Sequence, residues 1–404
     1  MSGSERLVGV DLARLVAVAG MMAAHTLAFT DPPVGAGVTA LIDGPPSTLF
    51  AVLGGVSVAL AARSRLAAGE RAAAVRSTLA RGLLVAVLGL LIVPIATAVF
   101  VVLAPFGVAI MAASVFLLLP TWVVAASALA LTALVGSLVA TARDRLGVLD
   151  GTHSIATLVV DPLGTLQDIV LTGVYPAITW LAYLLIGMLV ARALTAARAR
   201  GRERGALVGL AGFGAVLVAL GVGASELGLR LLGDARHPGE PALAREVLLG
   251  NGYGSVPSVD PLWQLLAAPH TGTPADIART VGIALLVIAL LSLIVSLLPS
   301  RVRRAVEPLR AAGGAPLTIY VVHITLLSGL QSLAAGSASW LADGWIAWAL
   351  QVAIALGIGA LLAGTAARGP LEALIGRCAD AAAGLRGTAR GTAMGSAEQL
   401  DGRG

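Results

Sequence analysis

The chain has 404 residues, of which 57% are hydrophobic and only 12% charged, and its formal net charge is +5. Soluble domains carry about 25% charged residues, so this composition excludes an ordinary soluble domain and predicts a lipid-facing surface. The arginines lie in short clusters between apolar stretches, as in membrane loops, so we do not expect nucleic acid as a partner. The single cysteine, Cys378, excludes an intramolecular disulfide and a cysteine-based metal site.

Ten stretches are apolar and approach the length of about 20 residues that a helix needs to cross a bilayer. In chain order they cover approximately residues 7–29, 47–62, 82–98, 99–119, 121–142, 173–192, 206–224, 277–298, 315–335 and 344–366. The division between the third and fourth stretches stays open, because they could also join into fewer, longer helices. Asp11 and Arg14 interrupt the start of the first stretch, which favours a membrane span over a cleaved signal peptide. We therefore predict an all-α polytopic integral membrane bundle of about ten helices.

Arginines gather in three connecting segments, residues 63–81, 192–204 and 301–310. Because Lys and Arg accumulate in cytoplasmic loops, both termini are expected in the cytoplasm and the long loops 143–172 and 225–276 outside, as ordered caps or re-entrant pieces. Residues 5–377 are expected to form one domain in the inner (plasma) membrane. Residues 378–404 are expected to be a largely disordered cytoplasmic tail.

Three ionisable residues, Asp11, Arg14 and His25, lie in the first predicted helix. At 100° per residue, Arg14 and His25 point within about 20° of the same direction, and His25 stands about 16 Å further toward the outside. Asp11 is a surface neighbour of Arg14. Charges within a span mark either a function or a buried pair, so Asp11 and Arg14 fit both readings. The imidazole of His25 can accept a proton at neutral pH, which favours a functional role.

Two further histidines are candidates. His323 lies in the middle of the ninth predicted span, with Tyr320 three residues earlier on the same side. A hydrogen-bonded core histidine is an equally good interpretation of that position. His270 lies in the second outer loop at a depth close to that of His25, where an exposed loop histidine is the alternative.

Glu372 follows the turn at Gly369-Pro370, where it is placed to pair with Arg14 or with a loop arginine at the cytoplasmic face. His153 and His237 receive no role. The sequence contains no histidine–glutamate metal spacing and no glycine-rich phosphate loop, so we expect no metal site.

Several short motifs occur along the chain, and their order is informative. They are Val10-Asp11-Leu-Ala-Arg14 with Gly20-Met21-Met22 and His25, Leu49-Phe50 with Gly54-Gly55-Val56-Ser57, Tyr175-Pro176 with Trp180 and Tyr183, Gly187-Met188, Pro269-His270-Thr-Gly272-Thr273, Leu317-Thr318-Ile-Tyr320 with His323, and Gly369-Pro370-Leu371-Glu372. Over about residues 5–377 this series resembles the transmembrane acyltransferase superfamily. It is most similar to YeiB-like bacterial membrane proteins, which are related to the heparan-alpha-glucosaminide N-acetyltransferase catalytic domain.

The resemblance implies a membrane acyltransferase that moves an acyl group, with acetyl as the expected one, from cytoplasmic acyl-CoA to a carbohydrate-like small-molecule, glycan or envelope acceptor. It implies that His25 is the general base and that Arg14, with Asp11, positions or binds a substrate. The remaining candidate substrate-binding residues are His323, Tyr320, His270 and Glu372. The basic inner segments would attract the CoA phosphates.

Two other functions stay open. The chain could be a proton-coupled transporter or flippase that uses the polar stripe of the first helix. It could also be a non-catalytic membrane component of an envelope complex. The sequence leaves the oligomeric state open as well, a homo-oligomer included.

Overall fold

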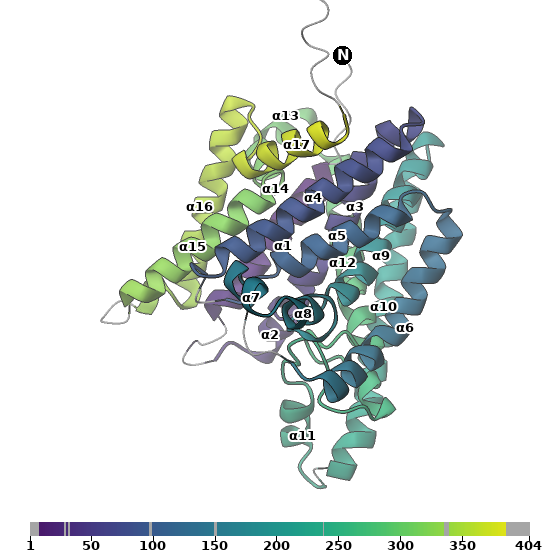
Figure 1. Cartoon of the computed structure of the whole chain (residues 1–404), viewed down its shortest axis with the longest axis vertical. Helices are drawn as coiled ribbons and strands as arrows, with labels where there is room; N and C mark the ends of the chain where they lie inside the picture. Colours follow the sequence, from purple (N-terminus) through teal and green to yellow (C-terminus); the bar gives the residue numbers. More distant parts are fainter. Residues whose placement is uncertain are drawn as a thin grey trace, which may run out of the picture.

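A computed structural model of the chain describes residues 8–27, 30, 33–96, 99–148, 152–236, 238–334 and 339–384. Within these ranges the regular elements are helices and there is no strand (Figure 1). Nine described segments are long and apolar enough to cross a membrane. Their helices are α1 (Val8–Leu27), α3 (Pro45–Ala67), α4 (Arg71–Ile92), α6 (Thr121–Leu146), α9 (Ala177–Ala199), α10 (Glu203–Arg236), α12 (Pro274–Leu297), α15 (Pro316–Ala334) and α16 (Gly344–Thr365). The prediction of an all-α polytopic membrane bundle is confirmed.

The region of the third and fourth predicted spans differs from expectation. The third apolar stretch belongs to α4, which ends before Pro94, a residue that cannot continue a helix ladder. The fourth forms α5 (Leu103–Phe116), which has only 14 residues and is too short for a full span on its own. The bundle therefore contains nine long segments and one short apolar helix in its described part.

The first basic segment is also shorter than predicted. Arg65 lies in the last turn of α3 and Arg71 begins α4, so only residues 68–70 connect the two helices. Arginine is a good helix former, and its long side chain can carry the charge out of the membrane while the backbone stays helical. The expected loop over residues 63–81 is therefore mostly helix.

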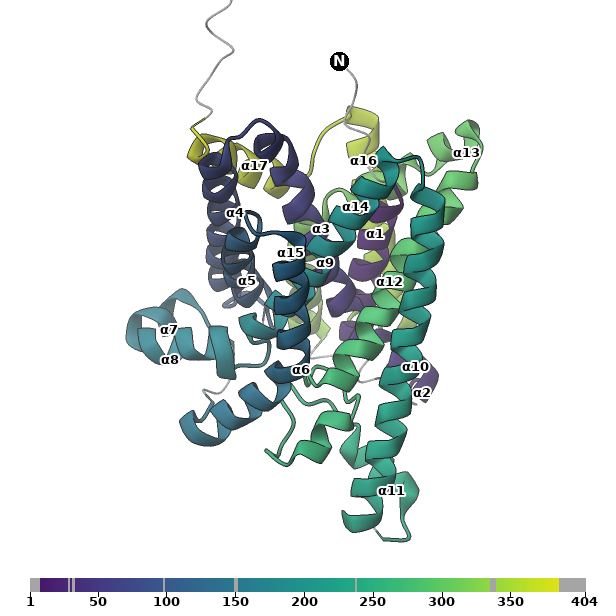
Figure 2. The same ribbon diagram turned by 90° about the vertical axis from the view of Figure 1, so that its right-hand side faces the viewer.

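Short helices cover both ends of the bundle (Figures 1 and 2). Near the start of α1 lie α13 (Ser300–Ala305), α14 (Glu307–Gly313) and α17 (Pro370–Ala382). Toward the other end lie α2 (Ala36–Ile42), α7 (Ile155–Val160), α8 (Pro162–Gln167), the π-helix η1 (Asp168–Thr172), α11 (Pro241–Leu248) and the 3-10 helix η2 (Pro261–Leu265). A further 3-10 turn, η3 (Ser339–Leu341), precedes α16. The described parts of the long connections thus form ordered caps.

Two helices extend across positions where the sequence suggested a boundary. The second long connection starts later than predicted, because α10 stays helical to Arg236. At the other end of the chain, α17 runs through residue 377 to Ala382, and residues 385–404 lie outside the described ranges.

Helix α1 lies inside the bundle, in contact with α3, α12, α14 and α16. Its residues Val10, Ala13 and Ala17 are at most 2% exposed. Glycines allow this close packing, because a Cβ atom on Gly9 would lie 2.5 Å from the Cα of Ser292 in α12. The polar stripe of α1 is therefore enclosed by other helices.

Candidate functional site

The structure brings together two histidines that are 298 residues apart in the sequence. Nδ1 of His25, near the end of α1, lies 2.9 Å from Nε2 of His323 in α15. The rings are nearly parallel, at an angle of 4°, with centroids 5.2 Å apart. His323 is 2% exposed, whereas His25 keeps partial exposure. His25 is therefore the more exposed of the two histidines.

A third helix completes this arrangement. The other ring nitrogen of His323, Nδ1, contacts Oε1 of Gln351 in α16. Gln351 is 1% exposed and was not a candidate from the sequence. A small cavity of about 10 Å³, lined mainly by apolar side chains, adjoins His323 and Gln351. The polar chain from α1 through α15 to α16 is thus embedded in an apolar environment.

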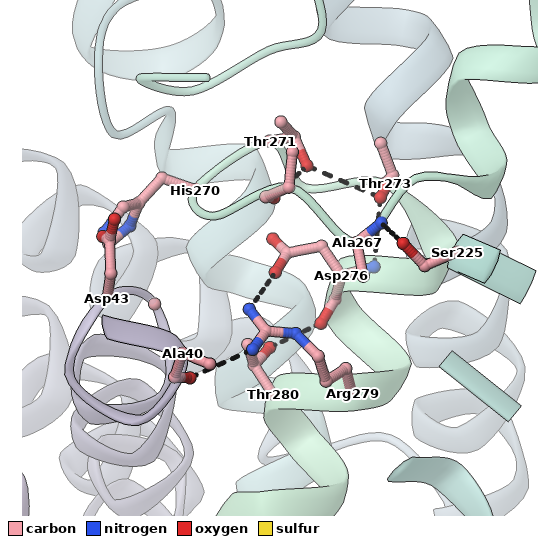
Figure 3. A network of polar contacts seen from close by, with 12 residues as sticks. Ala40, Asp43, Ser225, Ala267, His270, Thr271, Thr273, Asp276, Arg279 and Thr280 are labelled. Atoms are coloured by element: carbon pink, nitrogen blue, oxygen red, sulfur yellow. Dashed lines mark hydrogen bonds and ion pairs between the residues drawn. The ribbon is translucent and has the colours of Figure 1, made fainter. Parts of the chain in front are cut away.

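His270 approaches this region from the loop before α12. Its Nε2 lies 3.0 Å from Oδ1 of Asp43 (Figure 3). The same oxygen accepts a hydrogen bond from Asn251 at 3.2 Å. His270 adopts a left-handed backbone conformation, with φ of 60°, which is uncommon outside glycine. His270 is also one of the ionisable neighbours of His25. The loop before α12 thus holds His270 against Asp43, which follows α2.

Tyr175 packs against His270, with ring centroids 5.3 Å apart in an edge-on arrangement. Burial raises the pKa of the Tyr175 phenol, so this group stays protonated and can donate a hydrogen bond. The two side chains line a cavity of about 20 Å³, together with Thr179 and Asp276.

Sequence reasoning missed the polar network that holds the His270 loop (Figure 3). Asp276 is buried, lies 3.7 Å from Arg279, and accepts a hydrogen bond from the backbone of Gly272. Arg279 in turn donates to the carbonyl of Ala40 in α2 at 3.1 Å. The signal was present as Thr273-Pro274 followed by Asp276, which is typical of a helix N-terminus; Thr273 indeed caps α12.

Asp11 and Arg14 form the expected ion pair, at the end of α1 opposite to His25. Arg14 also donates to the hydroxyl of Ser57 in α3 at 2.9 Å. Arg310 of α14 lies 3.5 Å from Asp11 and donates to Glu307 at 2.7 Å. The helical rise of about 16 Å separates this charged cluster from the histidine pair. Asp11 and Arg14 are therefore not part of one cluster with His25.

Glu372 and Tyr320 both anchor α15. The Glu372 carboxylate accepts hydrogen bonds from the backbone of Leu317 at 2.7 Å and from that of Thr318 at 3.1 Å. It thus satisfies amide groups in the first turn of α15, and its described contacts are there rather than with an arginine. The Tyr320 hydroxyl is buried and accepts from the backbone of Val102 at 3.4 Å. Both residues help to place His323.

His153, to which the sequence assigned no role, pairs with Asp168. Its Nε2 lies 3.5 Å from Oδ2 of Asp168, which is 1% exposed and begins the π-helix η1. Burial lowers the pKa of His153, although the neighbouring Asp168 partly opposes this shift. His237 lies outside the described residues.

Among the described side chains, no group of three or more His, Cys, Asp or Glu residues is arranged to hold a metal ion. No curated protein and no solved structure matches the chain. The family model of the heparan-alpha-glucosaminide N-acetyltransferase catalytic domain does match, over residues 6–223. That range is more than half of the 404 residues and includes Asp11, Arg14 and His25. The chain therefore belongs to the heparan-alpha-glucosaminide N-acetyltransferase catalytic family, and is a multi-pass membrane protein of this acetyltransferase type.

Proposed function

We propose that the protein transfers an acyl group, most simply acetyl, from acyl-CoA to a hydroxyl or amine acceptor, with His25 as the general base. The observation that carries this proposal is the contact between His25 and His323 inside the bundle. A partly exposed imidazole, hydrogen-bonded on one side to a buried imidazole, is oriented by its partner and keeps one nitrogen for a substrate.

The reaction follows from this geometry. The acceptor oxygen or nitrogen attacks the thioester carbonyl carbon while His25 takes the acceptor's proton. A carbon–oxygen or carbon–nitrogen bond forms and the carbon–sulfur bond breaks. The thiolate of CoA then takes a proton from the His25 imidazolium and leaves as the free thiol. The hydrogen bond to His323 lets the second ring share the transient positive charge.

The donor is proposed to enter from the end of the bundle where α1 begins. Exposed arginines of several helices and turns gather there: Arg63, Arg71, Arg76, Arg200, Arg202, Arg204, Arg301, Arg303 and Arg304. Guanidinium groups suit the phosphates of CoA, so the side chains present fit this cosubstrate. The positive-inside pattern supports a cytoplasmic position for this end. We propose that both termini lie inside and that the protein resides in the inner (plasma) membrane.

The acceptor is proposed to approach from the other end, past His270, Asp43 and Tyr175. The carboxylate, the imidazole and the protonated phenol can all hydrogen-bond a carbohydrate-like or envelope acceptor. The cavities beside His270 and His323, about 20 Å³ and 10 Å³, are of the order of one water molecule. Side chains must therefore move before either substrate reaches His25.

The test uses purified protein and acetyl-CoA. The wild type is expected to hydrolyse acetyl-CoA slowly without an acceptor, seen as release of CoA thiol, and to gain thermal stability from it. His25→Asn should lower turnover at least about 100-fold while the protein stays folded. His153→Asn, a histidine change outside the proposed site, is the matched control and should keep turnover.

An unchanged rate in His25→Asn would overturn the role of His25. A wild-type protein that ignores acetyl-CoA but drives uptake into vesicles under a pH gradient would instead be the transporter or flippase. That alternative would use the buried charges of α1 as its path.

A further inference from the structure

The amide of Gln351 meets His323 with its oxygen. Oε1 of Gln351 contacts Nδ1 of His323, while Nε2 of Gln351 is buried and has no partner among the residues that the structure describes. An amide oxygen only accepts hydrogen bonds, so Nδ1 of His323 must carry a hydrogen. A neutral imidazole has one N–H group, and Nε2 of His323 is therefore a bare acceptor.

The same reasoning extends to His25. Nε2 of His323 lies 2.9 Å from Nδ1 of His25, so Nδ1 of His25 must supply the hydrogen of this contact. Nε2 of His25 is then left without a hydrogen. We propose that Gln351 is a positioning residue that selects the tautomers of both histidines and so makes Nε2 of His25 the proton-accepting atom. The catalytic part of this inference rests on the proposed acyl transfer, whereas the tautomers do not.

The opposite amide orientation would reverse every step. If the NH₂ group of Gln351 faced His323, Nδ1 of His323 would accept and its Nε2 would donate to His25. Nδ1 of His25 would then be the acceptor, its Nε2 would hold the hydrogen, and no lone pair would remain for a substrate proton. One amide thus decides whether His25 can act as a base at Nε2.

Stability alone does not require an amide at this position. Gln351 is surrounded by apolar side chains, including Met22, Ile354 and Ile358 around the adjoining cavity. Its oxygen satisfies Nδ1 of His323, but its amide hydrogens are buried without a partner among the described residues, which costs stability. The neighbouring Trp348, by contrast, makes a hydrogen bond that joins two helices: its indole N–H donates to the Ala19 carbonyl of α1 at 3.0 Å.

The two histidines can pass a proton along their hydrogen bond during the reaction, and the number of protons is conserved. When Nε2 of His25 takes the acceptor's proton, Nδ1 of His25 can pass its own hydrogen to Nε2 of His323. His323 is then an imidazolium whose Nδ1–H still faces the oxygen of Gln351. The hydrogen returns along the same path when the thiolate takes its proton from His25. Gln351 neither gains nor loses a proton.

The first experiment compares Gln351→Met with Trp348→Phe. Methionine keeps the length of the side chain but has no amide, so both His323 tautomers become accessible. We expect kcat to fall about 10- to 100-fold, the range seen when a partner that orients a histidine is lost. KM should be unchanged because Gln351 is not proposed to touch substrate. Tm should fall modestly, because methionine leaves the buried Nδ1–H of His323 without an acceptor. Trp348→Phe removes a helix–helix hydrogen bond and should lower Tm while keeping kcat.

Two kinetic results would overturn the inference. One is Gln351→Met with wild-type kcat. The other is an equal fall in kcat in Trp348→Phe at a similar loss of Tm, which would assign the effect to a merely structural role.

The second experiment needs no substrate. In protein labelled with ¹⁵N-histidine, nitrogen chemical shifts distinguish protonated from bare ring nitrogens, and loss of signals in His25→Asn and His323→Asn assigns them. His323 should be the Nδ1–H tautomer in the wild type and a mixture in Gln351→Met. A wild-type His323 with its hydrogen on Nε2 would refute the inference whatever the activity. If the expected tautomers are found but the protein does not transfer acyl groups, only the proposed function is refuted.

Discussion

Gly187 of α9 and Val52 of α3 are so close that a Cβ atom on Gly187 would lie 1.9 Å from the carbonyl oxygen of Val52. The approach is reciprocal, because a Cβ on Gly55 of α3 would lie 2.0 Å from the carbonyl oxygen of Leu184 in α9. Bare glycine backbones let membrane helices meet at this distance. Since α3 also contacts α1, this crossing helps to set the position of the helix that carries His25.

Gly187→Ala should therefore destabilise the protein. The methyl group would have to push the two helices apart, at a cost of about 1–3 kcal/mol or more. Gly212→Ala in α10 is the matched control, because a Cβ there meets nothing within 4 Å. It should be neutral or slightly stabilising. Thermal unfolding of the detergent-solubilised variants, with the yield of monodisperse protein, measures the difference; equal Tm values would contradict the crossing.

The histidine pair should behave as one unit in a double-mutant cycle. We expect His25→Asn to cost at least about 100-fold in kcat and His323→Asn to cost a substantial part of that. The double variant should be no slower than His25→Asn alone, because His323 acts through His25. Single-turnover acyl transfer checks this. Costs that multiply in the double variant would show that the two rings act independently.

His153 should make stability depend on pH. Burial lowers its folded-state pKa below the unfolded value of about 6.5, so the unfolded chain binds more protons between the two values. Stability is thus fully present above about pH 6.5 and is lost as the pH falls toward the folded pKa. Thermal unfolding of the wild type and His153→Gln at about pH 7.5 and pH 5.5 compares the two. The variant should lose less Tm on acidification; an equal loss would assign the effect to other groups.

The single cysteine allows a direct test of orientation. Cys378 in α17 is partly exposed at the basic end, and Val259 is 54% exposed in the connection at the other end. A membrane-impermeant maleimide applied to intact cells should label Val259→Cys in a Cys378→Ser background. It should label the wild-type Cys378 only after permeabilisation. The reverse pattern would place the termini outside.

The sequence predicts what depends on neighbours along the chain. The apolar lengths indicate the long helices, and the spacing of three residues predicts the pair of Asp11 and Arg14. The extent of α4 was underestimated, because Arg71 to Arg81 were assigned to a loop although arginine is compatible with a helix.

The contact between His25 and His323 could not be predicted, because it depends on how α1, α15 and α16 pack together. Gln351 did leave a signal, as the only amide side chain in the apolar helix α16. For His153, the sequence feature that indicates a partner is the charged residue Asp168 in an apolar segment. This feature becomes informative only when the fold brings His153 and Asp168 together.

The proposed base joins the first long helix of the described bundle to the last two. During synthesis, α1 enters the membrane long before α15 and α16 exist. His25 has neither its oriented tautomer nor its charge-sharing partner until the final segments are inserted. A nascent or truncated chain would therefore be inactive toward thioesters. The appearance of activity would indicate that assembly of the bundle is complete.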